Sequence, residues 1–193
     1  MRYASGYMRF IFDEKKAAQA AAFLLKRHGD RLNYMVLIKL LYLADRRALA
    51  ERGLPITGDR MMSMPKGPVL SGILDLINWG STDENSFWLE YISPATDYDV
   101  SLAKVDPEFR SLSRYELKVL QEIDDQFGAM DKWSLVKFTH RLQEWRDPHG
   151  SSFPIEPAEI LRSENRSEEE IAQIGFDADV AFYVQFLTSA PGR

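Results

Sequence analysis

The sequence contains no cysteine among its 193 residues. This absence excludes disulfide bonds, thiol catalysis and thiolate metal sites, and it is typical of proteins from a reducing cytoplasm. No stretch approaches the roughly 18–20 uninterrupted apolar residues that a membrane-spanning helix needs. The start of the chain, Met1 to Gly6, carries one basic residue with no apolar run behind it. We therefore expect a cytoplasmic protein with neither a membrane span nor a secretion signal.

Histidines are few and recognised catalytic motifs are missing. The three histidines are His28, His140 and His149. His140 and Glu144 stand four residues apart, but a zinc site needs at least a third protein ligand and no other histidine is near. The sequence has no nucleophile elbow, Walker loop or dinucleotide-binding glycine motif. We therefore expect no metal ion and no organic cofactor, and we predict that the protein is not an enzyme.

Basic residues do not outnumber acidic ones. The chain has 24 Lys and Arg against 29 Asp and Glu, which gives a formal net charge of −5. A phosphate backbone repels such a surface on average, so direct nucleic-acid binding would need a local basic patch. The densest basic cluster, at residues 39–52, is interleaved with Asp45 and Glu51, a pattern typical of a solvated helix face. We therefore do not expect direct contact with nucleic acid.

What the sequence does contain is a series of helix signals. Apolar residues recur at helical spacing between capping residues and glycines. Two capping boxes, Ser113 with Glu116 and Ser167 with Glu170, mark the starts of two of these helices. The expected helices cover residues 13–28, 33–52, 69–79, 113–127, 131–145, 157–161 and 167–187.

Extended segments are fewer. The clearest strand candidates are residues 87–92 and 98–102, joined as a hairpin, and a shorter segment at residues 60–64. Because a lone hairpin is marginal in water, we expect it to pair with residues 60–64 or to lie on a helix. The length suits one domain. We predict a mainly α fold: a single helical domain over residues 1–193 with about six to seven helices, a small antiparallel β-sheet or hairpin, and a short extension at residues 1–12.

Asp45 is the polar residue whose position most needs a partner. On a helical wheel it falls on the apolar side of the helix at residues 33–52, beside Ile38 and Leu41. A bare carboxylate there would cost several kcal/mol. Two interpretations follow: a structural tie to an arginine or to backbone amides of the 57–68 loop, or a general base. We favour the buried structural tie, because no companion acid, base or metal site accompanies Asp45.

Lys39, Tyr42 and Arg46 share another face of the same helix. Tyrosine and arginine are enriched among the residues that contribute most to protein interfaces. Together with the Lys66-Gly67-Pro68 loop, these side chains could form one partner-binding patch, and this patch is our prediction. The alternative is that Tyr42 packs internally and that the two cations are solvated.

Three motifs carry a resemblance to a known family. They are the run from Leu37 to Arg46, the Pro55-Ile56-Thr57-Gly58-Asp59 turn and Gly67-Pro68-Val69. They resemble the Panacea family, also described as SocA-like antitoxins, whose most specific mark is Lys-Leu-Leu-Tyr followed some twenty-five residues later by Gly-Pro-Val. The likeness continues through Trp133, Thr139-His140 and residues 144–148, and no catalytic motif accompanies it.

The resemblance implies a bacterial or phage toxin–antitoxin pair in which this protein binds and neutralises a cognate toxin. Lys66 stands where many relatives carry an uncharged residue, a difference within the expected partner-binding loop. Some relatives add a DNA-binding segment, and only about a dozen residues precede the first helix expected here. Two alternatives stay open: an adaptor that binds a host protein, for instance delivering a partner to a protease, and a hydrolase using Asp45 with His140 or His149. The sequence defines neither the toxin nor the oligomeric state.

Overall fold

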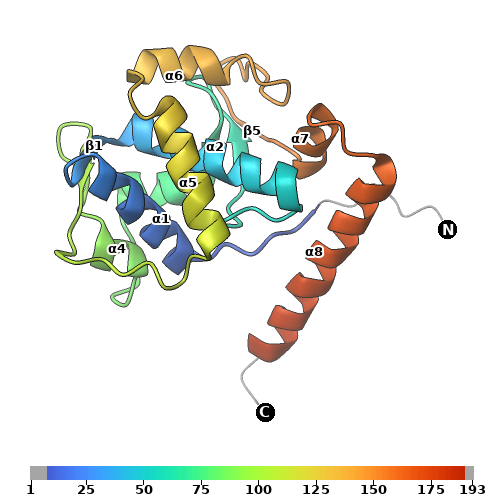
Figure 1. Ribbon diagram of the computed structural model, residues 1–193, viewed down its shortest axis with the longest axis horizontal. Helices are drawn as coiled ribbons and strands as arrows, with labels where there is room; N and C mark the ends of the chain where they lie inside the picture. Colours follow the sequence, from blue (N-terminus) through green and yellow to red (C-terminus); the bar gives the residue numbers. More distant parts are fainter. Residues whose placement is uncertain (1–7, 190–193) are drawn as a thin grey trace.

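The computed structural model describes residues 8–189, and most of these residues are helical (Figure 1). In this part of the chain eight helices occupy Glu14–Arg27 (α1), Tyr34–Arg52 (α2), Ser71–Trp79 (α3), Phe87–Tyr91 (α4), Arg114–Phe127 (α5), Lys132–Thr139 (α6), Pro157–Ser163 (α7) and Glu168–Ser189 (α8). Short strands occupy Arg31–Asn33 (β1), Met61–Ser63 (β2), Val69–Leu70 (β3), Asp99–Ser101 (β4) and Phe153–Pro154 (β5). β1 pairs with β4, and β2 lies between β3 and β5, all antiparallel. The mainly α fold with a small antiparallel sheet is confirmed.

Helix α2 is the central element of the fold. It contacts α1, α5, α6, α7 and strand β3, and α5 crosses it in Figure 1. Asn33 caps its start, Gly53 ends it in the left-handed conformation, and every residue from Val36 to Asp45 is buried. A helix covered on every side must find partners for its polar side chains, because a buried polar group without a hydrogen bond is costly.

Helix α1 packs against this core through alanine. The side chain of Asp13 caps its start by accepting a hydrogen bond from the Lys16 amide at 2.9 Å. Five alanines of α1 are fully buried: Ala17, Ala18, Ala20, Ala21 and Ala22. Their small side chains let α2, α4 and α5 approach closely.

The sequence predicts a strand at residues 87–92, but Phe87–Tyr91 form helix α4 instead, and Ile92 follows the helix in an extended conformation. Glu14 in α1 accepts hydrogen bonds from the Ser86 hydroxyl at 2.6 Å and from the Trp88 amide at 2.9 Å. Trp88 and Tyr91, three residues apart, are both buried against the core. The hydrogen bonds from Glu14 to the start of α4 and the burial of two rings at helical spacing both stabilise the helix. Together they outweigh the preference of aromatic residues for strands, which depends strongly on context.

The strand expected at residues 98–102 is present as β4. Part of its expected hairpin with residues 87–92 is present as an antiparallel bridge between Ile92 and Leu102, but the strand that β4 pairs with is not the expected one. Strand β4 pairs with β1, with Leu32 opposite Val100, rather than with residues 60–64. That segment contains β2, which pairs with β3 and β5. Because β3 takes up Val69 and Leu70, helix α3 begins at Ser71, two residues later than expected.

Helix α6 is shorter than the helix expected at residues 131–145 and ends at Thr139. Beyond it the chain makes tight turns, and the ring of His140 stacks on that of Trp145 with their centroids 3.8 Å apart. These turns bring Glu144 back towards α2. The expected helix ends early because Glu144 has buried partners there that a continuous helix would not reach.

Helix α8 stands away from the other helices in Figure 1 and meets them near α7. Its inner side lies against the end of α2: a Cβ built on Gly53 would be 2.7 Å from Cγ1 of Ile174. Of the extension expected at residues 1–12, residues 1–7 lie outside the described part, and Met8 packs near Gly175 of α8. Within residues 8–189, no helix is long and apolar enough to cross a membrane.

Gly53→Ala should destabilise the protein more than Gly29→Ala. Both glycines have a positive φ, 71° and 70°, so either alanine brings a backbone strain of about 1–2 kcal/mol. At Gly53 the added Cβ also meets Ile174, whereas at Gly29 it meets no atom of residues 8–189 within 4 Å. In urea denaturation, Gly53→Ala should lose at least about 1 kcal/mol more than the Gly29 control. Equal losses would contradict the packing of α8 on α2.

Candidate functional site

The candidate site is a set of polar side chains on α2, which we call the α2 polar set: Lys39, Tyr42, Asp45 and Arg46. Three of them are essentially inaccessible, with Lys39 and Asp45 1% exposed and Tyr42 0% exposed. The side chain of Arg46 is 15% exposed. Each finds a partner in a segment distant in sequence, so the set joins α2 to the loops around it.

Lys39 is tied to the loop at residues 64–68. Its Nζ donates a hydrogen bond to the backbone carbonyl of Pro68 at 2.6 Å. A Cβ built on Gly67 would lie 3.0 Å from Lys39 Nζ and 2.6 Å from Thr139 Oγ1, so this position has no room for a side chain. Burial lowers the pKa of Lys39 to about 7. The lysine motif and the Gly-Pro-Val motif, some twenty-five residues apart in the sequence, are therefore joined in the structure by the contact between Lys39 and Pro68.

Tyr42 and Arg46 share a single carboxylate. Glu144, 2% exposed, accepts hydrogen bonds from the Tyr42 hydroxyl at 2.9 Å and from Nε of Arg46 at 2.7 Å. Arg46 also donates to Glu164, just beyond α7, at 2.7 Å. Burial raises the pKa of Tyr42, and the adjacent carboxylate raises it further. This cluster joins α2 to the turns after α6 and to the end of α7.

Asp45 is held by the loop that follows α2. Its carboxylate accepts hydrogen bonds from the amide and the hydroxyl of Thr57, at 3.0 and 2.5 Å. Burial raises the pKa of Asp45 to about 7, against the lowering effect of both Thr57 hydrogen bonds. These contacts agree with the structural tie to the 57–68 loop, and its hydrogen-bond partners include no histidine.

A second carboxylate extends this tie to α3. The Asp59 amide donates to Thr57 Oγ1 at 3.2 Å, and its carboxylate accepts from the amides of Gly72 and Ile73 at 2.9 and 2.8 Å. Asp59 therefore caps α3 from outside the helix, since Leu70 at the N-cap position supplies no side-chain hydrogen bond. Burial raises the pKa of Asp59.

The structure places the expected partner-binding residues at two depths. Lys39, Tyr42, Gly67 and Pro68 are buried, so the expectation that Lys39 and Tyr42 lie on an exposed patch is wrong. Lys39 is bonded to the loop at residues 64–68, and Tyr42 is bonded to Glu144 in the turns after α6. Lys66 is exposed at the tip of that loop. The expected adjacency of the loop and the α2 stripe is observed, and a partner-binding role stays a prediction.

The histidines do not assemble a metal site or a catalytic centre with Asp45. Nε2 of His140 is buried and has no hydrogen-bond partner among residues 8–189, while burial and nearby Lys39 lower the pKa of its ring. His28 contacts Asp124 at 2.6 Å, and His149 lies exposed in a turn. Across the described residues, no group of three or more His, Asp or Glu side chains is arranged to hold a metal ion.

Two carboxylates of the site are missed by the sequence patterns. Tyr42 and Arg46 indicate that an acceptor must lie nearby, because a hydroxyl and a guanidinium on a buried helix require one. That acceptor is Glu144. A signal for Asp59 exists in the start of α3, which lacks a capping side chain of its own. Neither signal identifies its residue, because the partners stand too far away in sequence.

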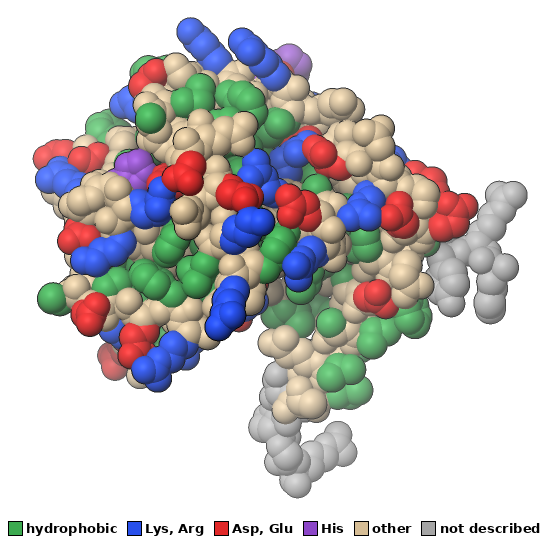
Figure 2. Space-filling model, viewed as in Figure 1, with side chains coloured by type: hydrophobic (Ala, Val, Ile, Leu, Met, Phe, Trp, Pro, Cys, Tyr) green, Lys and Arg blue, Asp and Glu red, His purple; other side chains and the backbone are tan. Residues whose placement is uncertain are grey.

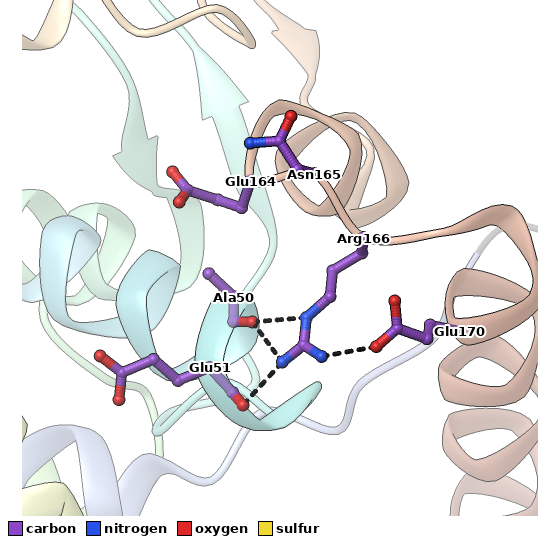
Figure 3. A pocket seen from close by; sticks show the side chains of 6 residues that line it. All are labelled: Ala50, Glu51, Glu164, Asn165, Arg166 and Glu170. Carbon is purple, nitrogen blue, oxygen red and sulfur yellow. Dashed lines mark hydrogen bonds and ion pairs between the residues drawn. The ribbon is translucent and has the colours of Figure 1, made fainter.

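A hollow of about 530 Å³ lies between the end of α2 and the turn that joins α7 to α8 (Figure 3). It is lined by Ala50, Glu51, Glu164, Asn165, Arg166 and Glu170. Arg166 donates to the carbonyls of Ala50 and Glu51 at 2.8–3.1 Å and pairs with Glu170 at 2.7 Å. Glu51 and Glu164 accept from Tyr115 and Arg46. Because its charged side chains already have hydrogen-bond partners, we assign the hollow to the attachment of α8 rather than to a ligand.

Asp45→Ala should lower the free energy of unfolding by about 1–3 kcal/mol, because the Thr57 amide and hydroxyl lose their buried acceptor. Asp75→Ala, which removes an exposed carboxylate from α3, is the control and should change the stability by less than about 0.5 kcal/mol. Thermal and urea denaturation measure both. Coincident curves for Asp45→Ala and the wild type would refute the structural tie.

Lys39→Met should remove a pH dependence of stability. The folded-state pKa of Lys39, about 7, lies below its ordinary value of 10.5. Between these values the unfolded chain binds a proton that the folded protein does not, so the unfolding free energy contributed by Lys39 rises with pH. Denaturation at pH 7–10 should show the wild type gaining stability relative to Lys39→Met. Lys66→Met, at an exposed lysine, should follow the wild type, and parallel profiles for all three proteins would contradict the burial of Lys39.

The family comparison covers the same part of the chain. The family model described as the antitoxin SocA-like, Panacea domain matches residues 37–146, more than half of the sequence. No curated protein and no solved structure matches the chain. The matched region contains the α2 polar set, the 64–68 loop and Glu144, while a single domain over residues 1–193 stays a prediction. The chain belongs to the family of SocA-like antitoxins with a Panacea domain.

Proposed function

We propose that this protein is a non-catalytic antitoxin that binds a partner toxin and neutralises it by direct contact. The observation that carries the proposal is the antitoxin-family match over residues 37–146. The contacts of the α2 polar set support it, because each side chain of the set holds a neighbouring segment in place. A scaffold that fixes the shape of its loops suits recognition of a protein partner, since preorganised loops lose little entropy on binding.

The proposed partner is the toxin encoded beside the antitoxin, and the pair acts in the cytoplasm. The net charge of −5 favours a protein partner with a complementary surface over a phosphate backbone. The proposed mechanism needs no metal ion and no organic cofactor, because masking a toxin requires only contact.

The six expected partner-binding residues divide between contact and support. Lys66, exposed at the tip of the 64–68 loop, touches the toxin. Lys39 binds the Pro68 carbonyl, and the bare backbone of Gly67 lets the loop lie against Thr139. Tyr42 and Arg46 act through Glu144, which they hold beside α2. In this proposal the buried residues shape the surface that Lys66 presents.

Co-expression with the product of the adjacent gene tests the proposal. The wild type should restore growth that this product arrests, and Lys66→Glu should weaken binding of the purified partner at least about tenfold, equivalent to about 1.4 kcal/mol. Lys118→Glu makes the same charge change on the exposed face of α5 and should behave as the wild type. Failure of the wild type to restore growth would contradict the antitoxin proposal, whereas full affinity of Lys66→Glu would exclude only the loop as a contact.

Repeating the growth assay in hosts that lack individual cytoplasmic proteases distinguishes direct neutralisation of the toxin from delivery of the toxin to a protease. Direct neutralisation predicts rescue in every strain. Rescue that requires one intact protease would favour the adaptor alternative.

A further inference from the structure

The outward face of helix α8 carries apolar side chains that no part of the described chain covers. They recur at spacings of three and four residues, which places them within an arc of about 100° on the helix. Each is at least 45% exposed. We call them the outer stripe: Phe176, Val180, Tyr183, Val184 and Leu187.

A different face of α8 holds the helix to the protein. Ile171 and Ala178, on the side opposite the outer stripe, are 5% and 7% exposed. The guanidinium of Arg9 lies 5.6 Å from the centre of the Phe182 ring. Just before the start of α8, Arg166 pairs with Glu170 and also donates hydrogen bonds to the last backbone carbonyls of α2 (Figure 3). The helix is therefore fixed through its inner face while the outer stripe faces away from that attachment.

The outer stripe extends along the part of α8 that projects from the body. From Phe176 to Leu187 the helix rises about 16 Å. In Figure 2 hydrophobic side chains gather on this projecting part, whereas the body beside it carries a mixture of both charges. An exposed apolar surface of this kind marks a contact site in a folded protein.

Uncompensated negative charge surrounds the outer stripe. Helix α8 contains five acidic residues and no Lys or Arg. Glu168 and Glu170 pair with Arg162 and Arg166, but Glu169, Asp177 and Asp179 have no cationic partner among residues 8–189. At 100° per residue, Asp177 and Asp179 lie on opposite flanks of the stripe, and Glu169 lies on its line nearer the start of the helix.

We propose that the outer stripe of α8 docks an amphipathic helix of the toxin whose apolar face is flanked by lysine or arginine. The identity of the partner as a toxin rests on the proposed function; the chemistry of the surface does not. A second copy of this chain fits less well, because Asp177 and Asp179 of two α8 helices would meet like charges. An anionic membrane surface is disfavoured for the same reason.

Helix α8 lies outside the part of the chain that matches the family model, and this position suggests a role in toxin specificity. The family match ends at residue 146, and α8 begins at Glu168. The outer stripe therefore lies outside the region described by the family model. In our proposal the matched region supplies the common scaffold, and α8 selects which toxin this particular chain accepts.

Two synthetic helical peptides probe the surface directly. The basic probe carries leucines at three- and four-residue spacing flanked by lysines, and the acidic probe has glutamate in place of every lysine. Fluorescence anisotropy with the full-length protein should show the basic probe binding at least tenfold more tightly than the acidic one. Val180→Ser combined with Leu187→Ser, which leaves the charge unchanged, should weaken the basic probe at least tenfold.

Matched variants separate the outer stripe from general attraction to an acidic protein. Trp79→Ser removes an exposed ring on α3, 84% exposed, and should bind the basic probe as the wild type does. Asp177→Lys combined with Asp179→Lys should reverse the preference towards the acidic probe. Circular dichroism verifies that each variant keeps its helix content. If the Val180/Leu187 variant binds the basic probe as tightly as the wild type, the proposal is overturned.

Sedimentation and growth distinguish the remaining outcomes. A wild-type dimer that the Val180/Leu187 variant converts to a monomer would make a second copy the occupant and overturn the proposal. If the wild type neutralises the toxin and this variant does so equally well, the stripe proposal fails while the antitoxin proposal stands. If the wild type does not neutralise the toxin, the antitoxin proposal fails, and charge-selective peptide binding still supports α8 as a docking surface for a basic helix.

Discussion

The buried amine of Lys39 is the constraint on which the arrangement around α2 depends. A lysine that is 1% exposed must have an acceptor, and the acceptor here is the backbone carbonyl of Pro68. The Pro68 carbonyl can reach Lys39 only if the residue before it has no side chain, because a Cβ at position 67 would collide with Thr139 and crowd Lys39. Gly67 meets this condition. β2 and β3, on either side of the loop, pair with each other and hold its ends. The shape of an exposed loop is thus set by the buried amine of a lysine inside the core.

The same requirement recurs along α2 and gives the helix an organising role. Asp45 fixes Thr57, and Thr57 accepts a hydrogen bond from Asp59, which caps α3. Tyr42 and Arg46 together fix Glu144 after α6. Hydrogen-bonded networks of this kind are costly when incomplete and specify one arrangement when every member is satisfied. One helix therefore positions segments that lie up to 118 residues further along the chain.

Local signals in the sequence predict the helices well, and contacts between distant residues explain the errors. The capping box of Ser113 and the caps at Asp13 and Asn33 act within a few residues, so α1, α2 and α5 begin where expected. The segment Phe87–Tyr91 is helical partly because Glu14 binds its first turn, which no local pattern reveals. In the site, a helical wheel suffices to predict that Asp45 needs a tie. It does not reveal whether a lysine among leucines reaches the surface or turns inward, because that depends on the loop above it.

The alanines of α1 restrict how this sequence can vary. All five are completely enclosed, with neighbouring helices against them, so a larger residue at any of these positions would have to displace backbone or several side chains at once. A survey of tolerated substitutions would therefore find the five alanines of α1 as sensitive to substitution as the α2 polar set. These alanines nevertheless supply no polar group to the candidate site. In this protein, intolerance to substitution and participation in recognition are separate properties, and only the exposed side chains can be assigned to recognition from such a survey.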